Sequence, residues 1–69
     1  MDEDELTERV LAAEEKLGEA YQLLGEIRDE LKAAGRKKDY QALNEVLDRL
    51  GRYGRMLGEM RASWGAPLD

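Results

Sequence analysis

The 69-residue sequence contains no cysteine and no histidine. The absence of cysteine excludes disulfide bonds and thiolate chemistry. The absence of histidine removes the commonest metal ligand and the commonest general base at neutral pH. Chemistry that depends on either side chain is therefore excluded, and we expect a protein without enzymatic activity and without a cofactor.

Long apolar runs are also absent, and the only proline is Pro67. No stretch approaches the roughly 18 apolar residues of a membrane-spanning helix. The first five residues, Met1-Asp2-Glu3-Asp4-Glu5, are acidic, whereas a secretory signal peptide begins with basic residues. These features predict a cytoplasmic protein that does not associate with membranes. The short chain allows one domain, residues 1–69, with a marginal core, so we expect oligomerisation to supply the missing stability.

Apolar residues recur at alternating steps of three and four in both halves of the chain. We call this the heptad pattern, and it is typical of helices that pack side by side in coiled coils and helical bundles. In the first half it comprises Leu6, Val10, Ala13, Leu17, Ala20, Leu24, Ile27, Leu31 and Ala34. In the second half it comprises Leu43, Val46, Leu50, Tyr53, Leu57, Met60 and Trp64. The pattern predicts an all-α protein.

The residues that flank the heptad pattern predict where the helices begin and end. The expected segments are a helix at about 3–34, a turn at 35–38, a helix at about 39–63 and a tail at 64–69. Asp2 and Asp39 are the expected N-caps, because an aspartate side chain accepts hydrogen bonds from the first turn of a helix. Gly35 is expected to end the first helix in the left-handed conformation, and Pro67 cannot continue the second. A turn this short makes the two helices an antiparallel hairpin.

Several apolar residues fall outside the heptad pattern: Leu11, Tyr21, Leu23, Leu47 and Met56. They widen the apolar surface beyond what two helices can cover, so we expect two hairpins to form a homodimeric four-helix bundle. The residues expected in the dimer core are Leu17, Leu24, Ile27, Leu31, Leu43, Val46, Leu50, Tyr53, Leu57, Met60 and Trp64.

The expected core has a size pattern, because alanines alternate with leucines on the first helix while the second helix supplies large residues. Small side chains on one helix therefore face large ones on the other. This layering in a helical hairpin resembles the Rop family of plasmid copy-control RNA-binding proteins. The resemblance implies the same dimer of hairpins and transfers no functional residue.

Five glycines lie inside the predicted helices, at positions 18, 25, 51, 54 and 58. Each interior glycine costs roughly 1 kcal/mol of helix stability relative to alanine, so together they need a compensating role. One interpretation is close packing, with grooves that accept aromatic rings such as those of Tyr21 or Tyr53. Another is a helix surface kept bare for a partner protein, and a third is a bundle weakened so that it can open.

Charge is distributed unevenly along the chain. Residues 1–35 carry eleven acidic and four basic side chains, and residues 36–69 carry five acidic and seven basic ones. We expect this asymmetry to favour helix pairing and solubility. The outward side of the first helix carries what we call the acidic line, about 36 Å long for 24 steps of 1.5 Å. Its members are Glu5, Glu8, Glu15, Glu19, Glu26 and Asp29. It is either a solvated face or a docking strip for a basic protein partner.

Two other functions are compatible with parts of the sequence. A nucleic-acid-binding regulator would use the basic residues of the turn and second helix, Arg36, Lys37, Lys38, Arg49, Arg52 and Arg55. The net charge of −5 and the acidic residues four positions before Arg49 and Arg52 disfavour this function.

A carboxylate-metal hydrolase is the third possibility. The pairs Glu26-x-x-Asp29 and Glu45-x-x-Asp48 resemble the magnesium ligands of the all-α nucleotide pyrophosphohydrolases. The heptad pattern directs these carboxylates to solvent, whereas a metal site in a bundle needs them to converge inside. The expected function is therefore non-catalytic protein–protein interaction by a homodimer, as a small adaptor, assembly factor or inhibitor.

Overall fold

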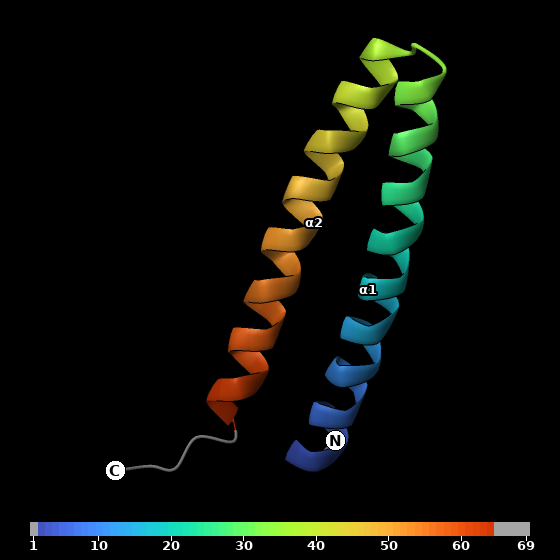
Figure 1. Ribbon diagram of the computed structural model, residues 1–69. Coiled ribbons are helices and arrows are strands. Elements are labelled where there is room, and N and C mark those ends of the chain that lie inside the picture. The colour runs from blue at the N-terminus through green and yellow to red at the C-terminus, as the bar shows by residue number, and fades with distance from the viewer. Residues whose placement is uncertain (1, 65–69) are drawn as a thin grey trace.

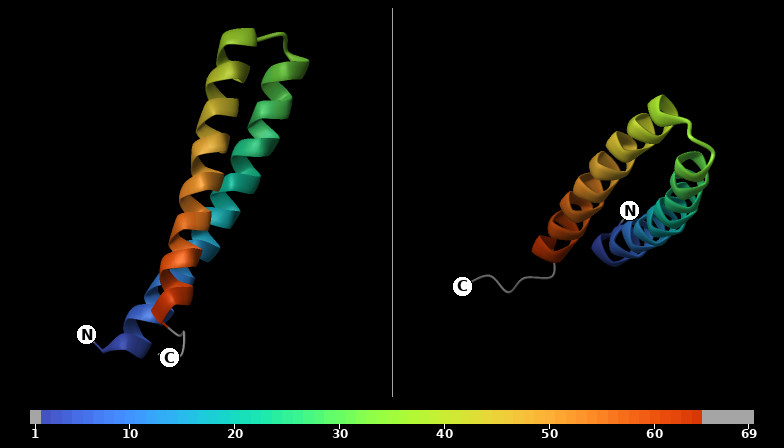
Figure 2. Two further views of the ribbon diagram at one scale, coloured as in Figure 1. Left: turned by 90° about the vertical axis from the view of Figure 1, so that its left-hand side faces the viewer. Right: turned by 45° about the horizontal axis from the view of Figure 1, so that its top comes forward.

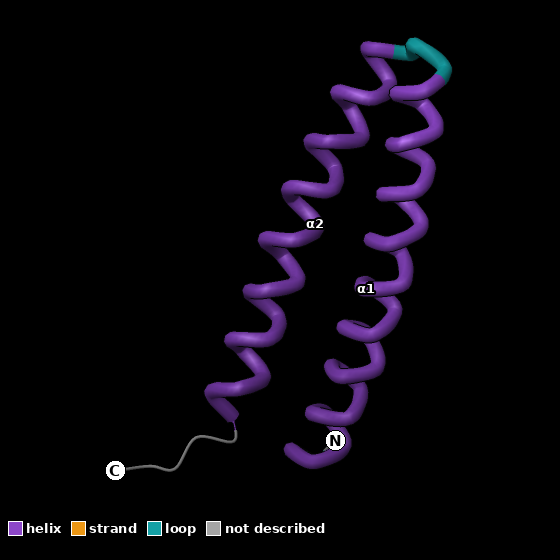
Figure 3. Tube along the Cα trace, viewed as in Figure 1, coloured by secondary structure: helices purple, strands orange, loops and turns teal. Residues whose placement is uncertain are grey.

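The computed structural model describes residues 2–64 of the chain (Figure 1). These residues form two long antiparallel helices joined by one short turn. Helix α1 spans Glu3–Ala33 and helix α2 spans Lys37–Trp64, so the predicted all-α hairpin is confirmed (Figure 3). Within the described residues, neither helix is long and apolar enough to cross a membrane. The predicted tail lies outside the described residues apart from Trp64, which belongs to α2.

The ends of α1 follow from Asp2 and Gly35, as predicted. The Asp2 side chain accepts a hydrogen bond of 2.8 Å from the backbone N–H of Glu5. Gly35 has a φ of +73°, the left-handed conformation that favours glycine. The N–H groups of Arg36 and Gly35 donate to the carbonyls of Leu31 and Lys32, at 3.0 and 3.1 Å, which closes the helix C-terminus.

Helix α2 begins two residues earlier than predicted, at Lys37 rather than Asp39. Asp39 therefore lies in the first turn of the helix and is not its N-cap. Its carboxylate accepts a hydrogen bond of 2.7 Å from the Arg36 guanidinium, while the Tyr40 N–H donates to the Arg36 carbonyl at 2.9 Å. An acidic side chain in the first turn interacts favourably with the positive end of the helix dipole. Asp39 therefore stabilises the start of α2 by its charge and not as an N-cap.

The contact between the helices is rotated from the heptad pattern. Apart from Leu6, which is exposed, the leucines of the pattern are half-buried on both helices. On α2, however, the contact also includes Tyr40, Leu47, Gly54 and Arg61. Leu47 falls outside the heptad pattern, yet with 3% of its surface exposed it is the one buried residue among those described. Val46, Tyr53 and Met60, one position before three of these residues, are exposed instead.

The hairpin is long and thin, with extents of 53 × 21 × 14 Å (Figure 2). Its Cα radius of gyration is 16.0 Å, whereas a compact domain of this length has about 11 Å. Its accessible surface is 5687 Å², and a compact monomer of 7.9 kDa exposes about 4,400 Å². The hairpin alone therefore leaves about 1,300 Å² more surface in water than a compact protein of its mass.

Candidate interaction surface

One side of the hairpin collects most of the large apolar side chains that remain exposed. Ile27 precedes the half-buried Arg28, and Val46 precedes the buried Leu47. Each residue lies one position before a residue of the helix contact, and on two antiparallel helices this places both side chains on the same side of the hairpin. The heptad spacing extends these two strips along each helix. We call this surface the apolar face; its large members are Leu6, Leu23, Ile27, Val46, Tyr53, Met56 and Met60.

The exposed fractions on the apolar face are large for such side chains. Tyr53 is 54% exposed, Met56 57% and Leu23 60%. Alanines of α1 at positions 13, 20 and 34 continue the same surface between the larger residues. An apolar surface of this kind marks an interaction site more often than a solvated one.

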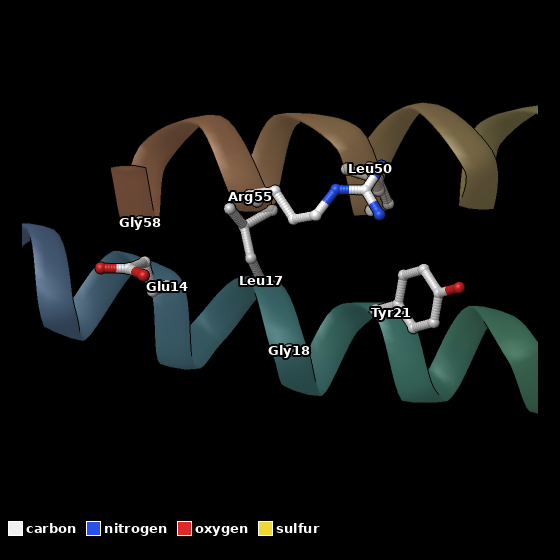
Figure 4. A pocket seen from close by; sticks show the side chains of 9 residues that line it. Glu14, Leu17, Gly18, Tyr21, Leu50, Arg55 and Gly58 are labelled. Atoms are coloured by element: carbon white, nitrogen blue, oxygen red, sulfur yellow. The ribbon is translucent and has the colours of Figure 1, made fainter. Parts of the chain in front are cut away.

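The opposite side of the hairpin carries an open groove of about 470 Å³ between the helices (Figure 4). We call it the glycine groove. Tyr21 lies in it beside Gly51, where an added Cβ would be 3.6 Å from the ring carbon Cε2. Leu17 reaches across it toward α2, and Arg55 extends along its edge. The other lining residues are Glu14, Gly18, Leu50, Gly54 and Gly58.

The helical glycines differ in how much space surrounds them. An added Cβ would meet nothing within 4 Å at Gly18, Gly25 and Gly54. At Gly58 it would lie 3.2 Å from Oε1 of Glu14. The predicted groove for an aromatic ring is therefore present at Tyr21 and Gly51, whereas three of the glycines have no close packing partner within the hairpin.

Glu14 and Arg61 form the one ion pair that joins the two helices among the described residues. Nε of Arg61 donates to Oε2 of Glu14 at 2.5 Å, and its Nη2 donates to Oε1 at 3.3 Å. The Arg61 hydrogen bond lowers the pKa of Glu14, and the Glu14 carboxylate raises the pKa of Arg61. Sequence reasoning missed this pair, because neither residue belongs to the heptad pattern.

The acidic line lies on the exposed outer side of α1, where all six members are exposed. Three of them have basic neighbours on the same helix. Glu5 lies 3.9 Å from Arg9, Glu19 lies 3.5 Å from Lys16, and Asp29 lies 3.2 Å from Arg28. The negative charge of the line is therefore partly balanced within α1.

Half of the basic residues that a nucleic-acid interface would use are paired with acidic side chains. Arg49 donates to Glu45 at 2.8 Å and Arg52 donates to Asp48 at 3.4 Å, each across one helical turn. Arg36 donates to Asp39, as described above. The other three are Lys37 and Lys38 at the start of α2 and Arg55 beside the glycine groove. These residues do not share one continuous basic surface.

The carboxylate pairs proposed as magnesium ligands lie apart on the two helices. All four residues, Glu26, Asp29, Glu45 and Asp48, are exposed. Glu45 forms an ion pair with Arg49, and Asp48 forms one with Arg52. Within residues 2–64, no group of three or more acidic side chains is arranged to hold a metal ion.

Comparison with protein-family models, with curated proteins and with solved structures found no match to this chain. The candidate site therefore depends on the geometry alone: a hairpin with an apolar face on one side and a glycine groove on the other.

Proposed function

We propose that this protein is a non-catalytic protein–protein interaction module that acts as a homodimer, in which two hairpins meet through their apolar faces to form a four-helix bundle. The observation that carries the proposal is the exposure of Ile27, Val46, Tyr53 and Met60. These residues belong to the heptad pattern, yet the partner helix within the hairpin does not cover them.

The rotation of the contact supports a bundle of four helices over a pair. On each helix, the heptad pattern and the helix contact share one row of residues and differ in the second row. On α2, for example, the pattern has Val46, Tyr53 and Met60, whereas the contact has the residues that follow them, Leu47, Gly54 and Arg61. The centre of the pattern is therefore turned by about 50° from the centre of the contact. In a four-helix bundle each helix has two neighbours at right angles, so its core-facing side lies about 45° from each contact. On both helices the heptad pattern is rotated toward the apolar face, as a core shared by four helices requires.

The area available also fits a dimer. Each partner in a standard protein–protein interface loses about 800 Å² of surface. The surplus surface of one hairpin, about 1,300 Å², exceeds that amount. Burial of this area on both copies falls within the range of obligate homodimers, roughly 2,000 Å² and above.

Two matched substitutions test the proposal. Ile27 on the apolar face is 49% exposed, and Leu11 on the other side of α1 is 45% exposed. We expect Ile27→Gln to weaken self-association at least tenfold, because burying an isoleucine contributes about 1.5–3 kcal/mol. Leu11→Gln should leave the dissociation constant within about twofold of the original.

Sedimentation equilibrium measures both constants, and circular dichroism checks that the variants stay helical. Equal effects of the two substitutions would show that the apolar face has no special role and would overturn the proposal.

In such a dimer the acidic line stays in water, and we propose it as the docking strip for a basic protein partner. The test is neutralisation of Glu8, Glu15 and Glu26 to glutamine, with Glu45, Asp48 and Glu59 on α2 as the matched control. A partner captured by the original protein should be lost with the first set and retained with the second. Retention with both sets would remove this role from the acidic line.

A further inference from the structure

Building on the proposed homodimer, we propose that the second copy covers the apolar face with its turn at the same end of the bundle, so that α1 of each hairpin packs against α2 of the other. The occupant of the apolar face is thus a second copy in one defined orientation. The argument depends on the register of the hairpin, the sizes of the facing side chains and the charge of each helix.

Two hairpins can meet face to face around a two-fold axis in two ways. In the same-end arrangement the axis runs along the bundle, both turns lie at one end, and every helix neighbours the other kind of helix. In the opposite-end arrangement the axis runs across the bundle, the turns lie at opposite ends, and α1 neighbours α1 while α2 neighbours α2. The two arrangements therefore bring different side chains together.

The register of the hairpin shows which residues lie at the same height. Tyr21 faces Gly51 and Glu14 faces Gly58, so the numbers of facing residues add to 72 in both pairs. An axis along the bundle preserves these heights in the second copy. Ala20 then lies within about one residue of the partner's Tyr53, and Ala13 within about one residue of its Met60.

The sizes of the facing side chains fit the same-end arrangement. Small residues on the α1 strip meet large ones on the α2 strip, and Ile27 meets Val46, so the layers have similar volumes. In the opposite-end arrangement the α1 strip, with three alanines among five residues, would pack against itself. The Val46, Tyr53 and Met60 strip would likewise pack against itself, leaving one side of the bundle loose and the other crowded.

Side chains at the edge of the apolar face fit as well. Leu23 and Met56 are its most exposed members, at 60% and 57%. By the same register, Leu23 lies level with the partner's Arg49, and Met56 lies level with the partner's Lys16. The aliphatic stems of long basic side chains can cover such apolar residues while their charged ends remain in water.

The charge of the helices favours the same neighbours. Helix α1 carries ten acidic and four basic side chains, a net charge of −6. Helix α2 carries four acidic and six basic ones, a net charge of +2. The same-end arrangement places opposite net charges beside each other at every contact, whereas the opposite-end arrangement places two strongly acidic helices side by side.

Distances between spin labels test the orientation. Because the chain has no cysteine, Lys37→Cys labels the turn and Glu3→Cys labels the open end with a single probe each. Pulsed electron paramagnetic resonance measures the distance between the two spin labels of each labelled homodimer. In the same-end arrangement both homodimers should give a distance below about 30 Å, set by the helix spacing and the label length. In the opposite-end arrangement both would instead be about 45 Å, the length of α1 at 1.5 Å per residue.

A mixture of the two labelled chains provides the internal control. It should add a distance of about 45 Å in the same-end dimer and a short one in the opposite-end dimer. Two long distances from the homodimers would overturn the orientation while the proposed function stands. A strictly monomeric chain, with no dipolar coupling at any concentration, would overturn both.

Discussion

Among residues 2–64, Leu47 is the side chain most completely enclosed by the hairpin, and Glu14–Arg61 is the ion pair that joins the two helices. The buried leucine contributes apolar stabilisation, and the charged pair fixes one helix against the other near the open end. All other apolar side chains in the contact are only half-buried. A few residues therefore determine whether the hairpin of a single chain holds together.

Truncation of Leu47 should be costly. We expect Leu47→Ala to lower the free energy of unfolding by about 2–3 kcal/mol, because a buried leucine loses its contacts and leaves a cavity. Thermal or urea unfolding of the original and variant chains measures this difference. Gln41→Ala, on the exposed side of the same helix, is the control and should change stability by less than about 0.5 kcal/mol. A Leu47 variant as stable as the original chain would show that the helix contact lies elsewhere.

The Glu14–Arg61 pair predicts a particular pH dependence. Since the pair lowers the pKa of Glu14 below its usual 4.5, the folded chain binds fewer protons than the unfolded chain below that pH. Its stabilising contribution is therefore fully present above about pH 5 and is lost as the pH falls through the lowered pKa. The unfolding free energy of Glu14→Gln, compared with the original chain between pH 2 and 7, should show this difference shrinking in acid. A difference that does not depend on pH would contradict the pair.

The missed contact residues illustrate what periodicity can and cannot reveal. On α2 the contact line at positions 40, 47, 54 and 61 reads Tyr, Leu, Gly and Arg, which is not an apolar stripe. The neighbouring line at 46, 53 and 60 reads Val, Tyr and Met, and because these residues are apolar the heptad pattern includes them. Periodicity locates the apolar side of a helix, whereas the direction of the nearest neighbour depends on how many helices share the core.

Helices α1 and α2 both continue through interior glycines, and the ends of α1 are specified by single residues. Asp2 and Gly35 could be identified from the sequence because each performs a local task that few residues can perform. The start of α2 could not, because Arg36, Lys37 and Lys38 are all compatible with either a turn or a helix. In the structure α2 begins at Lys37, where the Tyr40 N–H donates to the Arg36 carbonyl and the Arg36 side chain donates to Asp39.

The same substitution at two glycines should have opposite effects. Gly25 lies inside α1 with nothing within 4 Å of an added Cβ, so Gly25→Ala should raise the unfolding free energy by about 1 kcal/mol. Gly35 has a φ of +73°, so Gly35→Ala should lower it by about 1 kcal/mol. Thermal unfolding of both variants measures the two shifts. A loss of stability at Gly25 would indicate that another chain packs on the glycine side of α1.

The molecule as a whole is a hairpin that cannot enclose its own apolar residues. Its radius of gyration of 16.0 Å exceeds the roughly 11 Å of a compact domain of this length, and its apolar face remains exposed. The heptad pattern predicted an all-α protein and the short turn an antiparallel hairpin, and the structure confirms both. The assembly itself is a proposal, because it depends on contacts with a second chain. The identity of any other partner depends on surface chemistry that periodicity does not encode.

Sedimentation equilibrium of the unmodified chain over micromolar to millimolar concentrations tests the central claim most directly. We predict a reversible transition to a species of twice the 7.9 kDa mass of one chain, with helicity rising as the dimer forms. A chain that remains monomeric at millimolar concentration and still unfolds cooperatively would contradict the account.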